Sequence, residues 1–106
     1  MDTVEREELR RIVEEDRGVR VVLTLGPDAY AQAHIPGSES FPDLDSALRE
    51  LSPEDDVVLY CSHAACSSSR RAARRLQDRG LTRVRVYRGG LADWHAAGLP
   101  LQGSAA

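Results

Sequence analysis

The segment between residues 56 and 75 constrains the fold most. In it a short apolar run, a cysteine and a helical pattern follow one another directly, which predicts a strand, a loop and a helix in succession. Residues 57–60, Val-Val-Leu-Tyr, are too few for a helix and rich in β-branched side chains, as is typical of a strand buried on both faces. Cys61 follows at once, then a loop of small residues and an Ala/Arg/Leu segment that predicts a helix from about 69 to 79. Open α/β sheets place their chemistry at the carboxyl ends of their strands, so we expect Cys61 to be the working residue.

Strand and helix patterns alternate along the rest of the chain. A helix over 3–16 is expected, with Asp2 or Thr3 as its cap and Leu9, Ile12 and Val13 as its buried stripe. Further strands are expected at 19–25, 38–41 and 84–87, and further helices at 29–33, 44–51 and 91–97. This alternation predicts an α/β fold: a mainly parallel central sheet with helices on both faces.

The length of 106 residues predicts a single domain over 1–106, with a core at about 5–101 and a flexible tail at 102–106. No apolar run approaches the ~20 residues of a membrane span, and the acidic start lacks the pattern of a signal peptide. We therefore expect a cytoplasmic protein. A net charge of −3 without a basic tail gives no indication of nucleic-acid or membrane binding.

The cysteine count argues against a structural role for the thiols. Two cysteines are too few for a disulfide framework, and no second cysteine pair or His-x-x-x-His motif completes a zinc site. We expect no metal and no organic cofactor.

Several short motifs, in this order and at this spacing, resemble a single-domain rhodanese over about residues 5–101. They are His-Ile-Pro-Gly at 34–37, Tyr-Cys at 60–61, Val-Tyr-Arg-Gly-Gly-Leu at 86–91 with Trp94, and Ala-Gly-Leu-Pro at 97–100. The resemblance implies an α/β domain in which a loop after a central strand carries a nucleophilic cysteine, here Cys61.

The resemblance also implies a sulfur-transfer reaction. The cysteine of active members takes sulfane sulfur from a donor such as thiosulfate, becomes a persulfide and passes the sulfur to a thiophilic acceptor. That acceptor could be cyanide or a thiol, including one on a thioredoxin-like protein.

Two features depart from the commonest pattern of this family. Where members usually carry Asp-Val-Arg after the first long strand, this chain has Leu-Thr-Leu at 23–25 and so lacks a polar pair near the site. The loop is also two residues longer, and it resembles a subgroup with a second cysteine five residues after the first, here Cys66.

The composition of the loop suits an anion. A cysteine reacts as its thiolate, and small residues let a loop curl so that backbone N–H groups point inward and stabilise that charge. The helix that follows adds its positive end, worth roughly 0.3–1 kcal/mol at an exposed site, and two arginines in its first turn could attract an anionic donor. The predicted loop and anion-binding residues are Ser62, His63, Ala64, Ala65, Ser67, Ser68, Ser69, Arg70 and Arg71.

Individual roles within the loop stay open. Cys66 could be a resolving thiol that attacks an oxidised or persulfidated Cys61, the principal nucleophile, or an incidental residue. His63 could stabilise a thiolate or gate the donor, but we favour an exposed side chain. The three serines at 67–69 lack a serine-hydrolase motif, and capping of the helix explains them better.

Three functions compete. The leading hypothesis is a sulfurtransferase that works through a Cys61 persulfide. A thiol redox protein that uses Cys61 and Cys66 is a second hypothesis, and a catalytically weak binding or regulatory module is a third. A related phosphatase would need an arginine six residues after the cysteine, where this chain has Ser67, so we discount it.

Overall fold

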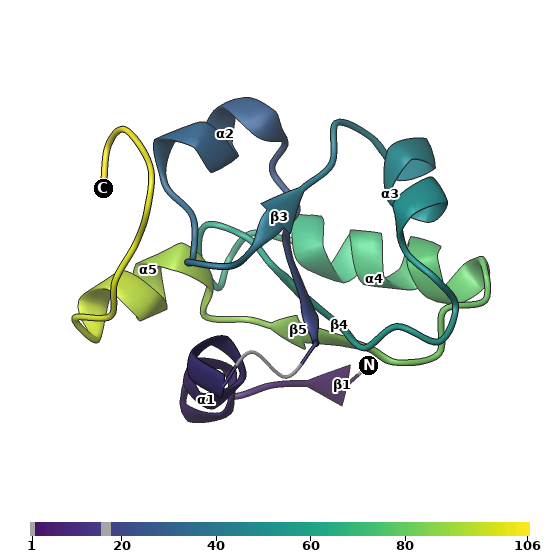
Figure 1. Ribbon diagram of the computed structural model, residues 1–106, viewed down its shortest axis with the longest axis horizontal. Coiled ribbons are helices and arrows are strands. Elements are labelled where there is room, and N and C mark those ends of the chain that lie inside the picture. Colours follow the sequence, from purple (N-terminus) through teal and green to yellow (C-terminus); the bar gives the residue numbers. More distant parts are fainter. Residues whose placement is uncertain (1, 16–17) are drawn as a thin grey trace.

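A sheet of five parallel strands forms the centre of the computed structural model, which describes residues 2–15 and 18–106 (Figure 1). The strand order is β1-β5-β4-β2-β3. The strands are β1 (Asp2–Thr3), β2 (Arg20–Leu23), β3 (Glu39–Ser40), β4 (Val57–Tyr60) and β5 (Val84–Tyr87). The helices are α1 (Arg6–Glu15), α2 (Pro27–Gln32), α3 (Leu44–Glu50), α4 (Ser68–Asp78) and α5 (Gly90–Ala96).

The middle strand, β4, has the bounds that the sequence predicts. It pairs in parallel with β2 on one side and β5 on the other, and all of its side chains are buried. Val58 and Tyr60 belong to one hydrophobic cluster and Val57 and Leu59 to another, because alternate side chains of a strand point to opposite faces. The strand that leads to Cys61 is therefore held rigidly from every side.

Helices cover both faces of the sheet, as predicted. On one face, α1 contributes Leu9 and Ile12, and α5 contributes Trp94, to the cluster around Tyr60. On the other face, α3 and α4 contribute Ala47, Ala73 and Leu76 to the cluster around Leu59. None of the helices described is long and apolar enough to cross a membrane.

The start of the chain differs from the prediction. Asp2 and Thr3 are not helix caps: they form β1, in register with Arg85 and Val86 of β5. The N–H of Val4 continues this pairing by donating to the carbonyl oxygen of Val86 at 3.0 Å, and α1 begins only at Arg6. Pairing with the edge of β5 satisfies backbone groups that a helix at 3–5 would leave to solvent. The predicted end of this helix, at 16 and 17, lies outside the described residues.

The last residues lie against α2, where the sequence predicts a flexible tail. His34 and Gln102 exchange two backbone hydrogen bonds of 2.9 Å, and the N–H groups of Ser104 and Ala105 donate to the carbonyl oxygens of Ala31 and Gln32. The yellow end of the ribbon in Figure 1 accordingly runs beside α2. These contacts are backbone to backbone, so side-chain patterns do not indicate them.

Candidate active site

Cys61 lies directly after β4 and is buried, with 2% of its surface exposed. The first turn of α5 holds the backbone at this point. The N–H of Leu91 donates to the carbonyl oxygen of Cys61 at 3.0 Å, and the N–H of Ala92 donates to that of Ser62 at 2.8 Å. The loop that carries the thiol is thus fixed at its start by a helix from a distant part of the chain.

Gly90 makes this contact possible. Its φ of +67° is one that L side chains rarely adopt, and a Cβ at this position would lie 2.5 Å from the carbonyl oxygen of Cys61 and 2.9 Å from the nitrogen of His63. Glycine is therefore required both by the backbone angle and by the close approach of the loop. The signal in the sequence is the Gly-Gly pair between the strand at 84–87 and the helix that follows it.

The two cysteines meet, as the sequence allowed: Cys61 and Cys66 form a disulfide, with their Cα atoms 6.4 Å apart. A tight turn brings Cys66 back toward the strand end. Its N–H donates to the carbonyl oxygen of His63 at 3.1 Å, and the N–H of Ala65 donates to His63 Nδ1 at 3.2 Å. Cys66 is half-buried, so the two sulfur-bearing residues differ in their access to solvent.

The rest of the loop is open to solvent at its tip. His63, Ala64 and Ala65 are exposed, in agreement with the interpretation of His63 as an exposed side chain. In this disulfide form the N–H groups of Ala65 and Cys66 bond within the loop, to Nδ1 and the carbonyl oxygen of His63. The anion-binding role of the loop stays a prediction.

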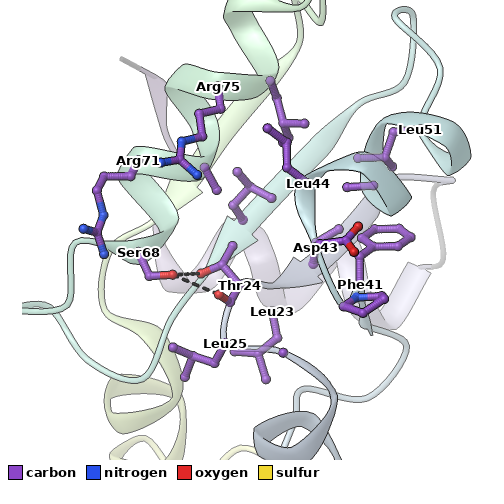
Figure 2. Close-up of a pocket in the computed structure, with 17 residues that line it drawn as sticks. Leu23, Thr24, Leu25, Phe41, Asp43, Leu44, Leu51, Ser68, Arg71 and Arg75 are labelled. Carbon is purple, nitrogen blue, oxygen red and sulfur yellow. Dashed lines mark hydrogen bonds between the residues drawn. The ribbon is translucent and has the colours of Figure 1, made fainter.

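The start of α4 is joined by hydrogen bonds to Thr24, the residue that follows β2. Ser68 Oγ lies 2.9 Å from both the carbonyl oxygen and Oγ1 of Thr24 (Figure 2). Thr24 Oγ1 in turn donates to the carbonyl oxygen of Tyr60 at 3.2 Å. Ser67 occupies the N-cap position, but its side chain makes no capping bond within the described structure. The capping interpretation is therefore wrong for Ser67, because its side chain accepts no hydrogen bond from the start of α4. The hydroxyl of Ser68 bonds to Thr24 instead. Ser69 is buried on α4.

Arg70 and Arg71 lie in the first turn of α4, as predicted, but neither pairs with another described residue. Arg71 and Arg75 lie on one side of a cavity of about 480 Å³, and Phe41 and Asp43 lie on the opposite side (Figure 2). The sequence did not predict this cavity. Its apolar lining includes Leu25, which is 38% exposed and replaces the arginine usual in the family pattern.

Tyr60, one residue before Cys61, links the central strand to the turn at 34–38 by hydrogen bonds. Its hydroxyl accepts from the N–H of Ile35 at 3.0 Å and lies 2.8 Å from Ser38 Oγ. Burial raises the pKa of Tyr60 to about 12, so the hydroxyl is neutral at ordinary pH. Through these bonds the turn at 34–38 is attached to the central strand.

The geometry permits reversible thiol chemistry. In the disulfide neither sulfur is a nucleophile, whereas addition of two electrons and two protons yields two thiols within bonding reach of each other. The released Cys61 thiol would lie at the carboxyl end of β4, where the backbone around it is fixed by α5.

Comparison with known proteins agrees with this arrangement. A family model described as "Rhodanese-like domain" matches residues 5–97. A sulfurtransferase of Allochromatium vinosum is 29% identical over 103 residues, which cover 95% of this chain and 94% of that protein. An HTH-type transcriptional regulator of Mycobacterium tuberculosis is 33% identical over 103 residues, which cover 94% of this chain but only 44% of the regulator. The chain thus spans less than half the length of that relative.

The fold is also found among solved structures. The BH2092 protein from Bacillus halodurans superposes with a TM-score of 0.88 at 26% identity, over 98% of this chain and 78% of that one. The family model covers most of the chain and includes the loop with Cys61. The chain therefore belongs to the rhodanese-like domain family.

Proposed function

We propose that the reduced protein is a sulfurtransferase in which Cys61 carries sulfane sulfur as a persulfide. The observation that carries the proposal is the position of Cys61 at the end of the central strand, on backbone that α5 holds in place. Membership of the family and the similarity to a sulfurtransferase of nearly the same length support it.

The reaction has two steps. The Cys61 thiolate attacks the outer sulfur of a donor such as thiosulfate, the S–S bond of the donor breaks, and sulfite leaves with the bonding electron pair. A thiophilic acceptor then removes the outer sulfur and restores the thiolate. Cyanide would leave as thiocyanate, and a thiol, for example on a thioredoxin-like protein, would leave as a persulfide.

Charge near the loop favours an anionic donor. Arg70 and Arg71 follow the loop and pair with no other described residue, so their charge is available to a diffusing anion. The neighbouring cavity, with Arg75 on the same side and an apolar lining, could hold the body of an acceptor.

The test is thiocyanate formation from thiosulfate and cyanide by the pre-reduced protein. Cys61→Ser is expected to lower the rate to background, because it removes the nucleophile. Cys66→Ser is the matched control: it also breaks the disulfide and should stay active. Activity retained in Cys61→Ser would overturn the proposal.

The disulfide favours a second candidate, a redox-responsive regulatory module. Its support is the Cys61–Cys66 bond together with the similarity to a transcriptional regulator. In this case the protein would form the disulfide under mild peroxide, and it would take no sulfur from any of several donors. Sulfur uptake on Cys61 would contradict it.

A further inference from the structure

We propose that Cys66 discharges the Cys61 persulfide as free hydrosulfide, and that an external dithiol then resets the site by attacking Cys66. This inference rests on the proposed sulfurtransferase function. It adds a product, a class of reducing partner, and a distinct role for each sulfur.

The disulfide identifies the atom that Cys66 can reach. A persulfide on Cys61 has two sulfur atoms, of which the inner one is Sγ of Cys61 itself. The bond in the structure joins Sγ of Cys66 to that inner atom. The folded loop therefore directs Cys66 to the sulfur whose substitution expels the outer one.

The step balances without another reactant. The Cys66 thiolate attacks Sγ of Cys61, the persulfide S–S bond breaks, and the outer sulfur leaves as hydrosulfide with the electron pair. The outer sulfur is reduced, and the two cysteine sulfurs are oxidised to the disulfide. The disulfide must then be reduced before Cys61 can accept sulfur again.

The loop can open and close while both of its ends stay fixed. Its start is held by the hydrogen bonds from Leu91 and Ala92 in α5, and α4 is held by the Ser68–Thr24 contact. The segment between them is exposed at 63–65 and is tied mainly to itself, through His63. Movement confined to this tip would make room for a persulfide and then return Cys66 to it.

Access to solvent determines which sulfur the reductant attacks. Cys61 is 2% exposed, whereas Cys66 is half-buried beside the exposed tip of the loop. Attack on Cys66 leaves a mixed disulfide there and releases Cys61 as the thiolate that the donor needs. The second thiol of a dithiol then frees Cys66, so the reducing partner should be a dithiol and not a monothiol.

A single-turnover experiment tests the discharge. Reduced protein, freed of external thiol, receives one equivalent of thiosulfate, and sulfide and intact mass are measured. The wild type should release about one equivalent of sulfide per chain and end as the disulfide, lacking two hydrogens. Cys66→Ser should gain one sulfur and release none, and Cys61→Ser should do neither.

The outcomes separate this inference from the proposed function. If Cys66→Ser gains sulfur and the wild type also keeps its persulfide, the discharge is wrong while the sulfurtransferase proposal stands. If Cys66→Ser gains no sulfur from thiosulfate or from an organic persulfide, the sulfurtransferase proposal fails, and the discharge fails with it.

The direction of reduction is tested with a monothiol. Oxidised wild type is treated briefly with glutathione, quenched with acid and alkylated, and the adduct is located by fragment-ion mass spectrometry. Glutathione should be found on Cys66 and the alkyl group on Cys61. Glutathione mainly on Cys61 would overturn the assignment of Cys66 as the entry point.

Discussion

Among single residues, the site depends on how closely α5 approaches the loop that carries Cys61. Gly90 lies where a Cβ would overlap the carbonyl oxygen of Cys61, and Leu91 donates a hydrogen bond to the same oxygen. The proposed nucleophile is thus positioned by a residue with no side chain, nearly thirty positions away in the sequence.

We expect Gly90→Ala to destabilise the protein more than Gly98→Ala. Both glycines have positive φ, but a Cβ at Gly98 meets nothing within 4 Å, so that variant measures the backbone penalty alone. The added overlap at Gly90 should cost about 1–3 kcal/mol more in the free energy of unfolding. Urea titration measures the difference. Equal losses of unfolding free energy in the two variants would show that the loop shifts to accommodate the added methyl group at little cost.

The buried hydroxyl group of Tyr60 makes the stability of the fold depend on pH. Its hydroxyl accepts from the N–H of Ile35 and contacts Ser38, and burial holds its pKa at about 12, above its ordinary value of about 10. Because the folded state binds this proton more tightly, the stabilisation is complete below pH 10 and is lost as the pH rises toward 12.

Tyr60→Phe should therefore lower stability at pH 7 by about 1–3 kcal/mol, since it leaves buried polar groups without their partner. The wild type should then lose part of this advantage between pH 10 and 12. Unfolding titrations at a series of pH values measure both effects. A constant difference across the alkaline range would contradict the proposed role of the hydroxyl proton.

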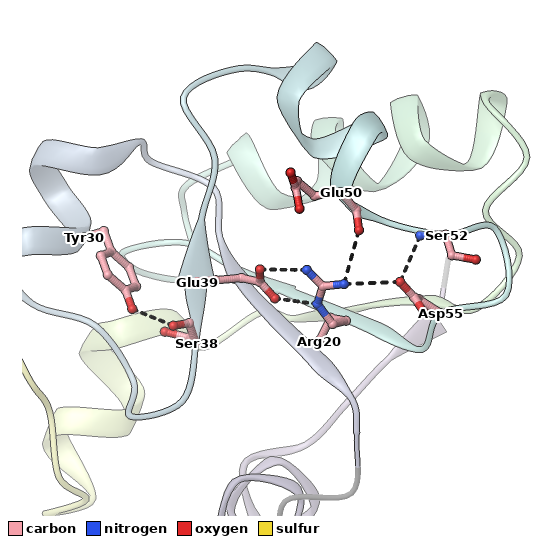
Figure 3. Close-up of polar contacts among 7 residues, drawn as sticks. All are labelled: Arg20, Tyr30, Ser38, Glu39, Glu50, Ser52 and Asp55. Atoms are coloured by element: carbon pink, nitrogen blue, oxygen red, sulfur yellow. Dashed lines mark hydrogen bonds and ion pairs between the residues drawn. The ribbon is translucent and has the colours of Figure 1, made fainter.

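Among the secondary-structure elements, Arg20 joins four segments near the sheet edge: β2 itself, β3, the end of α3 through the carbonyl oxygen of Glu50, and the turn before β4 (Figure 3). Arg20 of β2 donates to both carboxylate oxygens of Glu39 in β3, at 2.6 and 2.8 Å, and lies 3.4 Å from Asp55 in the turn before β4. The side chains of Arg20 and Glu39 are 31% and 34% exposed, so water screens the pair only in part. The bidentate bond helps to hold the short edge strand β3.

Arg20→Gln should cost about 1 kcal/mol of unfolding free energy, a value discounted for partial screening. Arg10→Gln is the matched control, since Arg10 also bonds two carboxylates, Glu7 and Glu14, but these are 62% and 58% exposed and lie on the same helix. The control should lose less. An equal or larger loss in Arg10→Gln would mean that the contact between β2 and β3 adds little.

The sequence allows prediction of those elements whose own side-chain pattern determines their secondary structure, and not of those that form through pairing with a distant segment. The bounds of β4 could be predicted because its four side chains form a continuous apolar run that begins directly after Asp55 and Asp56. β1 was missed, because two exposed polar residues become a strand only where the edge of β5 is available for pairing. The position of Gln102 beside His34 likewise depends on long-range backbone bonds.

In the candidate site, too, features set by the local sequence could be predicted and contacts between distant segments could not. The position of Cys61 could be predicted from the strand before it and the loop after it, and the second cysteine from the family resemblance. The link from Ser68 to Thr24 and the cavity beside Leu25 could not, because each needs two segments that the fold brings together over more than forty residues. The serines were therefore interpreted locally, as caps.

In the molecule as a whole, the fold brings the proposed sulfur-carrying residue within bonding distance of a second cysteine. In the disulfide form Cys61 has no free thiol, so the disulfide must be reduced before the proposed activity can begin. In the regulator from Mycobacterium tuberculosis the matching segment is less than half of a longer chain.

The proposed sulfur transfer is tested most directly by the intact mass of reduced Cys66→Ser after incubation with thiosulfate, because this variant cannot discharge a persulfide internally. We expect a gain of one sulfur that maps to Cys61, disappears on addition of cyanide, and is not seen when Cys61 is also replaced by serine. A mass that stays unchanged with thiosulfate and with other sulfane-sulfur donors would contradict a Cys61 persulfide.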